Sequence, residues 1–217
     1  MTDFATRRRM MVDTQVRPSD VTKFPIIDAM LSVPREMFVP GSQQEAAYAE
    51  QPIALTPGRT VLDARTLAKM LDALALDGND LVLDIGGGYG YSSAIMARMS
   101  EAVVMVEEDD TLAEEATTLL MDSGADNVVV HHGPLAAGAA EHGPYDVIIC
   151  QGGVGQVPEA VTDQLKAGGR IACIFMQGAL GDVKVGLKSE TGLSWRSVFN
   201  AGAPVLPGFE KETEFSL

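Results

Sequence analysis

One stretch limits what this chain can fold into more than any other: LVLDIGGGYGYSSAIMARM, residues 81–99. Residues 81–85 are a short apolar run that follows the turn-forming residues 77–80, a pattern that predicts a buried strand. Residues 91–99 carry apolar side chains at helical spacing. A strand, a glycine turn and a helix in this order build a ligand site. Glycines let a bound group approach the backbone, and the start of the helix offers unpaired N–H groups.

The glycine spacing indicates which ligand this turn holds. It does not match the dinucleotide pattern Gly-x-Gly-x-x-Gly, because the two possible frames end on Tyr91 and Ser93. The sequence has instead an acid followed by alternating glycines: Asp84, Gly86, Gly88 and Gly90. An acid at a strand end repels a pyrophosphate but attracts an amino or sulfonium group. This favours S-adenosylmethionine (SAM) over NAD as the ligand.

A second acid supports the same interpretation. Residues 102–106 predict the next strand, which ends in Glu107 roughly 20 residues beyond the glycines, where a carboxylate can accept both hydroxyls of a ribose. The alternative is that Asp84 caps the following helix and Glu107 is a solvated charge. We favour SAM because both acids fall at strand ends of one βαβ unit.

Composition limits the partners and the location. The chain has 217 residues and a formal charge of −14, so nucleic acid and anionic membranes are not expected as partners. No apolar run approaches the length of a bilayer span, and no apolar segment follows the arginines near the N-terminus, so neither a membrane helix nor a signal peptide is expected. We expect a cytoplasmic protein. Cys150 and Cys173 lie in apolar strands and predict buried thiols rather than a disulfide or metal pair.

The region before the glycine turn predicts helices and a long loop. Helices are expected over 4–16 and over 21–32, the second after the cap candidates Ser19 and Asp20. Residues 33–60 contain four prolines and predict loop and short pieces, and a long segment of this kind is usually functional. Asp63 is the expected cap of a helix over 64–76.

After the turn, strands and helices alternate. Helices are expected over 111–121 and 158–166, and residues 135–144 predict a short helix or a loop. The further expected strands are 127–131, 145–150, 170–175, 183–188 and 194–199. This order predicts one α/β domain with a doubly wound, mostly parallel seven-stranded sheet, an antiparallel edge and an N-terminal helical cap. Its parts are expected at residues 1–62 (helices and substrate loop), 63–177 (cofactor core) and 178–217 (edge hairpin).

Several segments together resemble the protein-L-isoaspartate O-methyltransferase family. They run in order over nearly the whole chain: MVDTQVRP (11–18), IIDAMLSVPREMFVP (26–40), AYAEQPIALTPGRT (47–60), LDIGGGYGYSS (83–93), DNVVVHHG (126–133), YDVIICQGG (145–153) and QLKAGGRI (164–171). The resemblance implies a SAM-dependent methyltransferase fold. It implies methyl transfer to the carboxylate of isoaspartyl residues in damaged proteins, a repair reaction, and a proline-rich loop that folds over SAM and frames the substrate.

The predicted cofactor site gathers at the carboxyl ends of the parallel strands, where ligands bind in such sheets. The candidate cofactor-binding residues are Asp84, Gly86, Gly88, Gly90, Tyr91, Glu107, Gly133 and Gln151. A sulfonium methyl is already activated and a carboxylate is already an anion, so alignment matters more than proton transfer. No catalytic histidine is required. Adjacent His131 and His132 point to opposite faces of a strand, which argues against a shared metal, and His142 in a loop indicates nothing by itself, so no metal is expected.

Three positions depart from the family pattern. Leu62 stands where the family loop Gly-x-Thr-Ile-Ser has its serine, and Pro134 replaces the acid that contacts the adenine amino group. Residues 150–155 replace the usual Thr-Ala-Ala-Ala-Pro. Thr60 is the remaining catalytic candidate, with the alternative that it only orders the loop. An alternative function therefore stays open, a divergent SAM-fold protein with another carboxylate substrate or a non-catalytic binding role.

Overall fold

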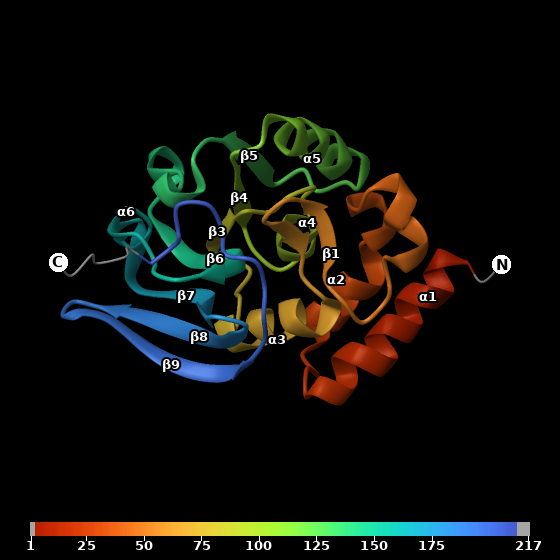
Figure 1. Cartoon of the computed structure of the whole chain (residues 1–217), viewed down its shortest axis with the longest axis horizontal. Coiled ribbons are helices and arrows are strands. Elements are labelled where there is room, and N and C mark those ends of the chain that lie inside the picture. Colours follow the sequence, from red (N-terminus) through yellow and green to blue (C-terminus); the bar gives the residue numbers. More distant parts are fainter. Residues whose placement is uncertain (1–2, 212–217) are drawn as a thin grey trace.

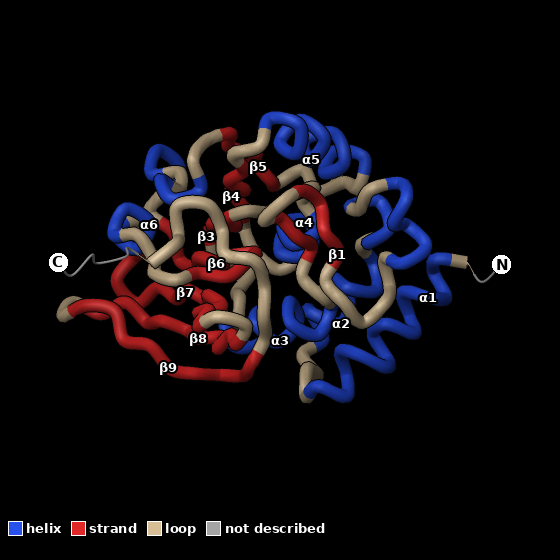
Figure 2. Tube along the Cα trace, in the orientation of Figure 1, coloured by secondary structure: helices blue, strands red, loops and turns tan. Residues whose placement is uncertain are grey.

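The computed structural model describes residues 3–211, and its centre is a seven-stranded sheet of order β5-β4-β3-β6-β7-β8-β9 (Figures 1 and 2). The first five strands in this order are parallel to one another. The last two pairs, β7 with β8 and β8 with β9, are antiparallel. The strand bounds are β3 Leu81–Ile85, β4 Ala102–Glu107, β5 Val128–His132, β6 Tyr145–Val154, β7 Leu165–Gln177, β8 Leu180–Ser189 and β9 Gly192–Asn200. The predicted mostly parallel sheet with an antiparallel edge is confirmed.

The strand order fixes where a ligand can sit. From β3 the chain proceeds outward to β4 and β5, then returns to the other side of β3 for β6 and β7. The strand order therefore reverses between β3 and β6. In open α/β sheets the crevice at such a reversal, outside the carboxyl ends of the strands, is the ligand site.

Alternating side chains of the parallel strands pack into two separate cores. Leu83 and Ile85 face one core, and Val82 faces the other, as period-two alternation requires. The Val82 side is covered by the larger helices. These are α1 Phe4–Met11, α2 Phe24–Ser32, α3 Ala64–Leu74, α4 Tyr91–Ala97 and α5 Asp110–Asp122. In Figure 1, α1 lies on the side of the molecule away from the β8–β9 hairpin.

The other face of the sheet has a thinner cover. It consists of the short helix α6 (Glu159–Asp163), a 3-10 turn at Leu135–Ala137 and the segment after β9. In this last segment Val205 forms an isolated parallel bridge with Gly153 of β6, and the Phe209 side chain is fully buried. The sequence predicts an edge hairpin over residues 178–217, but β9 ends at Asn200, and the chain after it packs against β6 instead.

The N-terminal region differs from expectation in two details. The helical stretch from Phe4 continues as a π-helix over Val12–Val16 and a 3-10 turn over Arg17–Ser19. The predicted start of the next helix was wrong: α2 begins at Phe24, with Pro25 in its first turn, and Asp20 lies in the left-handed region at φ 66° rather than capping it. A proline is preorganised for the first helical turn, and so it placed the start more strongly than the candidate caps did.

The proline-rich segment 33–60 contains a hairpin that the sequence analysis did not predict. It begins with 3-10 turns at Arg35–Phe38 and Gly41–Ala46, followed by β1 (Ile53–Thr56) and β2 (Arg59–Val61). Pro57 and Gly58 form the turn, and Gly58 has φ +79°. This β1–β2 hairpin lies in front of α4 in Figure 1 and belongs to a separate two-stranded sheet.

Local predictions made from specific side chains were confirmed. The Asp63 carboxylate caps α3 by accepting from the N–H of Thr66 at 2.9 Å. Cys150 and Cys173 are buried free thiols with sulfur atoms 3.5 Å apart.

Within residues 3–211 no helix is long and apolar enough to cross a bilayer.

We expect the C-terminal cover to contribute strongly to stability. Phe209→Ala removes a fully buried ring from the thinly covered face of the sheet, and it should lower the free energy of unfolding by about 3–5 kcal/mol in a denaturant titration. Phe24→Ala is the control, because the Phe24 side chain is 76 % exposed. Equal small effects of the two substitutions would show that the segment after β9 does not form part of the core.

Candidate functional site

The glycine loop after β3 forms the floor of the site. Gly86, Gly88 and Gly90 adopt φ values of +79°, +61° and +94°, a region that side chains other than glycine avoid. The Gly86 N–H donates to the carbonyl of Val106 at 2.9 Å, which ties the loop to the end of β4. Gly90 is the N-cap residue of α4, and a Cβ there would lie 3.0 Å from Leu120 of α5. Gly90 therefore allows both the positive φ of the loop and the close packing of α4 on α5.

Asp84 at the end of β3 is fully buried and surrounded by donors. Its carboxylate accepts from the hydroxyls of Ser92 and Ser93 at 2.6 and 2.5 Å and from Nε2 of Gln151 at 2.7 Å. Burial raises the pKa of Asp84 above its usual value, and these hydrogen bonds oppose that shift. The predicted residues Asp84 and Gln151 are thus in direct contact, from β3 and β6.

Glu107 at the end of β4 is equally buried and is held mainly by backbone groups. Its carboxylate accepts from the N–H groups of Gly88 at 3.0 Å, Glu108 at 3.0 Å and Asp109 at 3.2 Å. Its remaining partner is the guanidinium of Arg59, which forms an ion pair through Nη2. The two predicted acids therefore lie at the ends of neighbouring strands, on either side of the glycine loop.

Arg59 comes from the β1–β2 hairpin and enters the site from above the glycine loop. Its side chain is only 4 % exposed, and a Cβ on Gly86 would lie 2.6 Å from Arg59 Nη1. Leu55 of the same hairpin lies so close to Gly88 that a Cβ there would clash with Leu55 Cδ1. Among residues 3–211, neither Nε nor Nη1 of Arg59 has a hydrogen-bond partner. The guanidinium thus has buried donor capacity to spare.

The hairpin leaves little free space next to the acids. The cavity between the hairpin and the glycine loop measures about 10 Å³ and is lined by Thr60, Leu62, Gly87, Tyr91 and Gln151, among others. Small-molecule sites usually have volumes of roughly 300–1,000 Å³. A nucleoside-sized ligand that contacts both Asp84 and Glu107 would therefore require the β1–β2 hairpin to move away from Gly86 and Gly88.

Thr60 and Tyr91 both bring unsatisfied hydroxyls to this cavity. Neither Thr60 Oγ1 nor the Tyr91 hydroxyl has a hydrogen-bond partner in the described part of the chain, although both atoms are buried. Burial raises the pKa of Tyr91. The Arg35 guanidinium lies 4.7 Å from the centre of the Tyr91 ring and donates to the Leu62 carbonyl at 2.8 Å. Arg35 thereby fixes both the loop after β2 and the start of α4.

Gly133 lies at a more open part of the strand ends. Its N–H donates to the Glu107 carbonyl at 3.1 Å, so it follows β5 directly beside the end of β4. With Glu108, Asp109, His132 and Pro134 it borders a hollow of about 560 Å³. The predicted cofactor residues thus occupy one continuous edge of the sheet, covered by the hairpin near Asp84 and open near Gly133.

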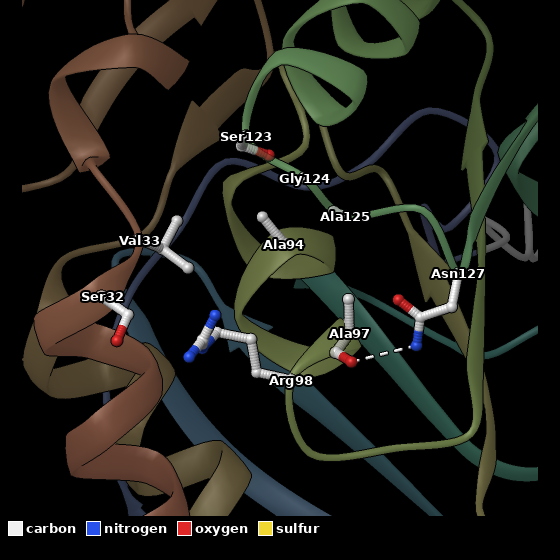
Figure 3. Close-up of a pocket in the computed structure, with 9 residues that line it drawn as sticks. All are labelled: Ser32, Val33, Ala94, Ala97, Arg98, Ser123, Gly124, Ala125 and Asn127. Atoms are coloured by element: carbon white, nitrogen blue, oxygen red, sulfur yellow. Dashed lines mark hydrogen bonds between the residues drawn. The ribbon is translucent and has the colours of Figure 1, made fainter.

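Another cavity lies away from these residues, near the amino-terminal ends of β4 and β5. It measures about 340 Å³, and Figure 3 shows its lining side chains, which include Arg98 and Asn127. Asn127 Nδ2 donates to the Ala97 carbonyl at 3.0 Å, and Arg98 forms an ion pair with Asp28 at 3.6 Å. Its lining contains none of the predicted site residues, so it is separate from the site at the strand ends.

Sequence reasoning missed four side chains that complete the site. They are Leu55, Arg59, Ser92 and Ser93. The two serines directly follow the glycines on the first turn of α4, and this position would have placed them near Asp84. Arg59 is the one cation between Arg35 and Arg65, but only a prediction of the hairpin could have directed it to Glu107.

The sheet order, the glycine loop and the acids at the ends of β3 and β4 define a SAM-dependent methyltransferase fold. The chain belongs to the protein-L-isoaspartate(D-aspartate) O-methyltransferase family, whose model matches residues 7–191. A protein-L-isoaspartate O-methyltransferase of Pelobacter propionicus is 36 % identical over 165 residues, or 76 % of this chain and 73 % of that protein. One of Roseiflexus castenholzii is 35 % identical over 78 % of this chain and 77 % of its own length.

Solved structures agree with this assignment. A protein-L-isoaspartate O-methyltransferase superposes with a TM-score of 0.80 at 27 % identity, covering 93 % of this chain and 66 % of that chain. A Plasmodium falciparum beta-aspartate methyltransferase, solved with S-adenosyl-L-homocysteine, gives a TM-score of 0.78 at 18 % identity, covering 95 % of this chain and 99 % of that chain. The second likeness concerns the fold alone.

The chemical groups of these residues suit a SAM molecule. Two buried carboxylates suit the amino group and the ribose hydroxyls of such a ligand, and the glycines allow it to approach the backbone. The unpartnered Thr60 hydroxyl and Arg59 nitrogens add polar groups that need a partner. A ribose bound at Glu107, as the sequence predicts, would compete with Arg59, because a carboxylate that accepts from ribose hydroxyls has fewer acceptor sites left for the guanidinium.

The competition predicts opposite effects for the two partners of the ion pair. Glu107→Gln should weaken binding of S-adenosylhomocysteine by about 1.5–3 kcal/mol, because charge-assisted hydrogen bonds to the ribose are lost. Isothermal titration calorimetry measures this, with Glu101→Gln, an exposed acid just before the same strand, as the control. Unchanged affinity in Glu107→Gln would show that Glu107 does not contact the ligand.

Arg59→Met should act in the other direction on affinity. It leaves Glu107 buried without its cation, so the free energy of unfolding should fall by about 3 kcal/mol, while binding of S-adenosylhomocysteine should tighten because no ion pair has to be broken. Arg59→Lys, which keeps the charge, should preserve most of the stability. If Arg59→Met binds more weakly than the parent protein, then Arg59 contacts the ligand rather than competing with it.

Proposed function

We propose that this protein transfers the methyl group of SAM to the free carboxylate of isoaspartyl residues in damaged proteins or peptides. The family membership supports this, and the observation that carries it is the pair of buried carboxylates, Asp84 and Glu107, at the reversal of strand order. Such a repair reaction takes place on proteins made in the cell, and we propose a cytoplasmic location. Neither nucleic acid nor a membrane is proposed as a partner.

The reaction depends more on the alignment of the methyl group with the acceptor carboxylate than on acid–base catalysis. Bound SAM supplies an activated methyl group, and the acceptor carboxylate is already a nucleophile. Asp84 and Glu107 would hold the amino and ribose groups, and the glycine loop would let the ligand approach the backbone. The β1–β2 hairpin, with Leu55 and Arg59, would close over the reacting groups and exclude water.

Thr60 is the proposed contact to the acceptor. Its hydroxyl is buried, faces the small cavity beside Gly87 and Gln151, and lacks a partner among residues 3–211. A donor at this position can orient a carboxylate for in-line attack. Leu62, which is 2 % exposed, has no hydrogen-bonding side chain to share that task.

A second candidate function rests on the observation that Asp84 and Glu107 already have hydrogen-bond and ion-pair partners within the protein. Asp84 accepts from three side chains of the protein itself, and Glu107 has its own cation in Arg59. This arrangement, together with Pro134 beside Gly133, favours a protein that binds SAM weakly and acts on another carboxylate, or one with a binding role only.

The decisive experiment combines turnover with binding. We expect methanol release after incubation of an isoaspartyl peptide with SAM, and none from the matched aspartyl peptide. Thr60→Val should lower kcat by roughly tenfold to a hundredfold, because one positioned donor is lost, whereas Thr60→Ser should retain activity. Full activity of Thr60→Val would limit Thr60 to ordering the loop.

Titration with SAM separates the remaining outcomes. Binding without turnover of the isoaspartyl peptide contradicts the proposed substrate and supports another carboxylate acceptor. Failure to bind both SAM and S-adenosylhomocysteine contradicts the enzymatic proposal and supports the non-catalytic role.

A further inference from the structure

The chain has three histidines, and the fold brings two of them together with a carboxylate. His131 is on β5, and Glu141 and His142 lie in the 3-10 turn Ala140–His142. His131 Nδ1 is 3.3 Å from Glu141 Oε1, and His142 Nε2 is 3.4 Å from the same oxygen. The ligand atoms of the three residues all lie within 4.8 Å of one another.

We propose that His131, Glu141 and His142 form a binding site for a divalent metal ion, with Zn²⁺ as the ion that suits the donor set. Two imidazoles and one carboxylate are ligands that zinc prefers. In a tetrahedral site with bonds of about 2.0–2.2 Å, neighbouring ligand atoms lie roughly 3.4 Å apart. The contacts of Glu141 Oε1 to His131 and His142 match that spacing.

These contacts are too long for strong hydrogen bonds. Charge-assisted N–H···O bonds are about 2.7–2.9 Å long. The other histidine of the strand shows the contrast, since His132 Nε2 lies 2.9 Å from Asp110 Oδ1. The rings of His131 and His142 meet edge to face, with their centres 5.6 Å apart at 79°. Glu141 Oε1 thus lies between two imidazole nitrogens at a spacing that a metal ion could bridge.

The backbone around the ligands is held in place without a metal. His131 lies on the edge strand β5, where it pairs with Val106 of β4. The turn that carries Glu141 and His142 is fixed at Ala139, whose carbonyl accepts from the buried Tyr145 hydroxyl at 2.6 Å and whose N–H donates to Gln164 Oε1 at 2.9 Å. A site whose ligands come from fixed backbone loses little conformational entropy when it binds an ion.

The ligands leave room for water or an outer ligand at the ion. The side chains of His131, His142 and Glu141 are 24 %, 37 % and 68 % exposed, so an ion can enter from solvent. The net charge of −14 raises the local concentration of cations. A bound ion would join the connection between β5 and β6 to the end of β5, next to Gly133.

From the sequence alone no metal is expected, because the adjacent His131 and His132 point to opposite faces of a strand. These adjacent side chains do have different neighbours, since His132 contacts Asp110 and the carbonyl of Glu108. The third histidine lies eleven positions after His131, in a segment without a predicted fold. Only the tertiary structure brings His142 beside His131.

Calorimetric titration of the full chain with zinc chloride, after removal of metals with a chelator, tests the proposal. We expect one saturable site, and with Co²⁺ as the probe, visible absorption bands of a tetrahedral complex. His131→Ala and His142→Ala should each weaken zinc binding by roughly tenfold or more, as expected when a ligand is lost. His132→Ala is the matched control and should bind zinc like the parent protein.

Two results would overturn the proposal: no saturable zinc binding by the parent protein, or an equal loss in His132→Ala and His142→Ala. Circular dichroism checks that each variant is folded. If His131→Ala unfolds, Glu141→Gln and His142→Gln, both at exposed positions, provide the same test. Because the readout is metal binding, it is independent of the methyltransferase proposal.

Discussion

The two carboxylates at the carboxyl ends of β3 and β4 are the constraint around which the rest of the structure is arranged. A carboxylate with no solvent exposure is stable only when hydrogen bonds and opposite charge replace water. Asp84 obtains its partners from α4 and β6, and Glu107 obtains them from the glycine loop, the backbone after β4 and the β1–β2 hairpin. Segments far apart in the sequence therefore meet at this edge because the acids require them.

The hairpin connects this requirement to function. Arg59 neutralises Glu107, and Leu55 packs on Gly88, so the same residues that stabilise the buried acid also cover the place where a SAM-like ligand would lie. If the ribose binds Glu107 as proposed, ligand binding is an exchange in which ribose hydroxyls replace a guanidinium. The net affinity depends on the difference between two favourable interactions with one carboxylate, and modest substitutions in the hairpin can change it in either direction.

The two faces of the sheet are unequal in a way that matters for this site. The face under α1 to α5 has a deep core, whereas the other depends on α6, short turns and the segment after β9. The thinner side includes the turn with Glu141 and His142. An ion bound there would reinforce the connection between β5 and β6, where Leu135 is the one large aliphatic side chain.

The sequence by itself determined the sheet, the glycine turn and the identity of the two acids. These follow from local rules: alternation and apolar runs mark strands, glycines mark positive φ, and the order of elements restricts the topology. Only the tertiary structure decided that Arg59 pairs with Glu107, that Gln151 binds Asp84 and that His142 meets His131. Each of these contacts joins residues whose separation in the chain carries no periodic signal. Their proximity depends on how the prolines of segment 33–60 and the turns after β5 direct the backbone.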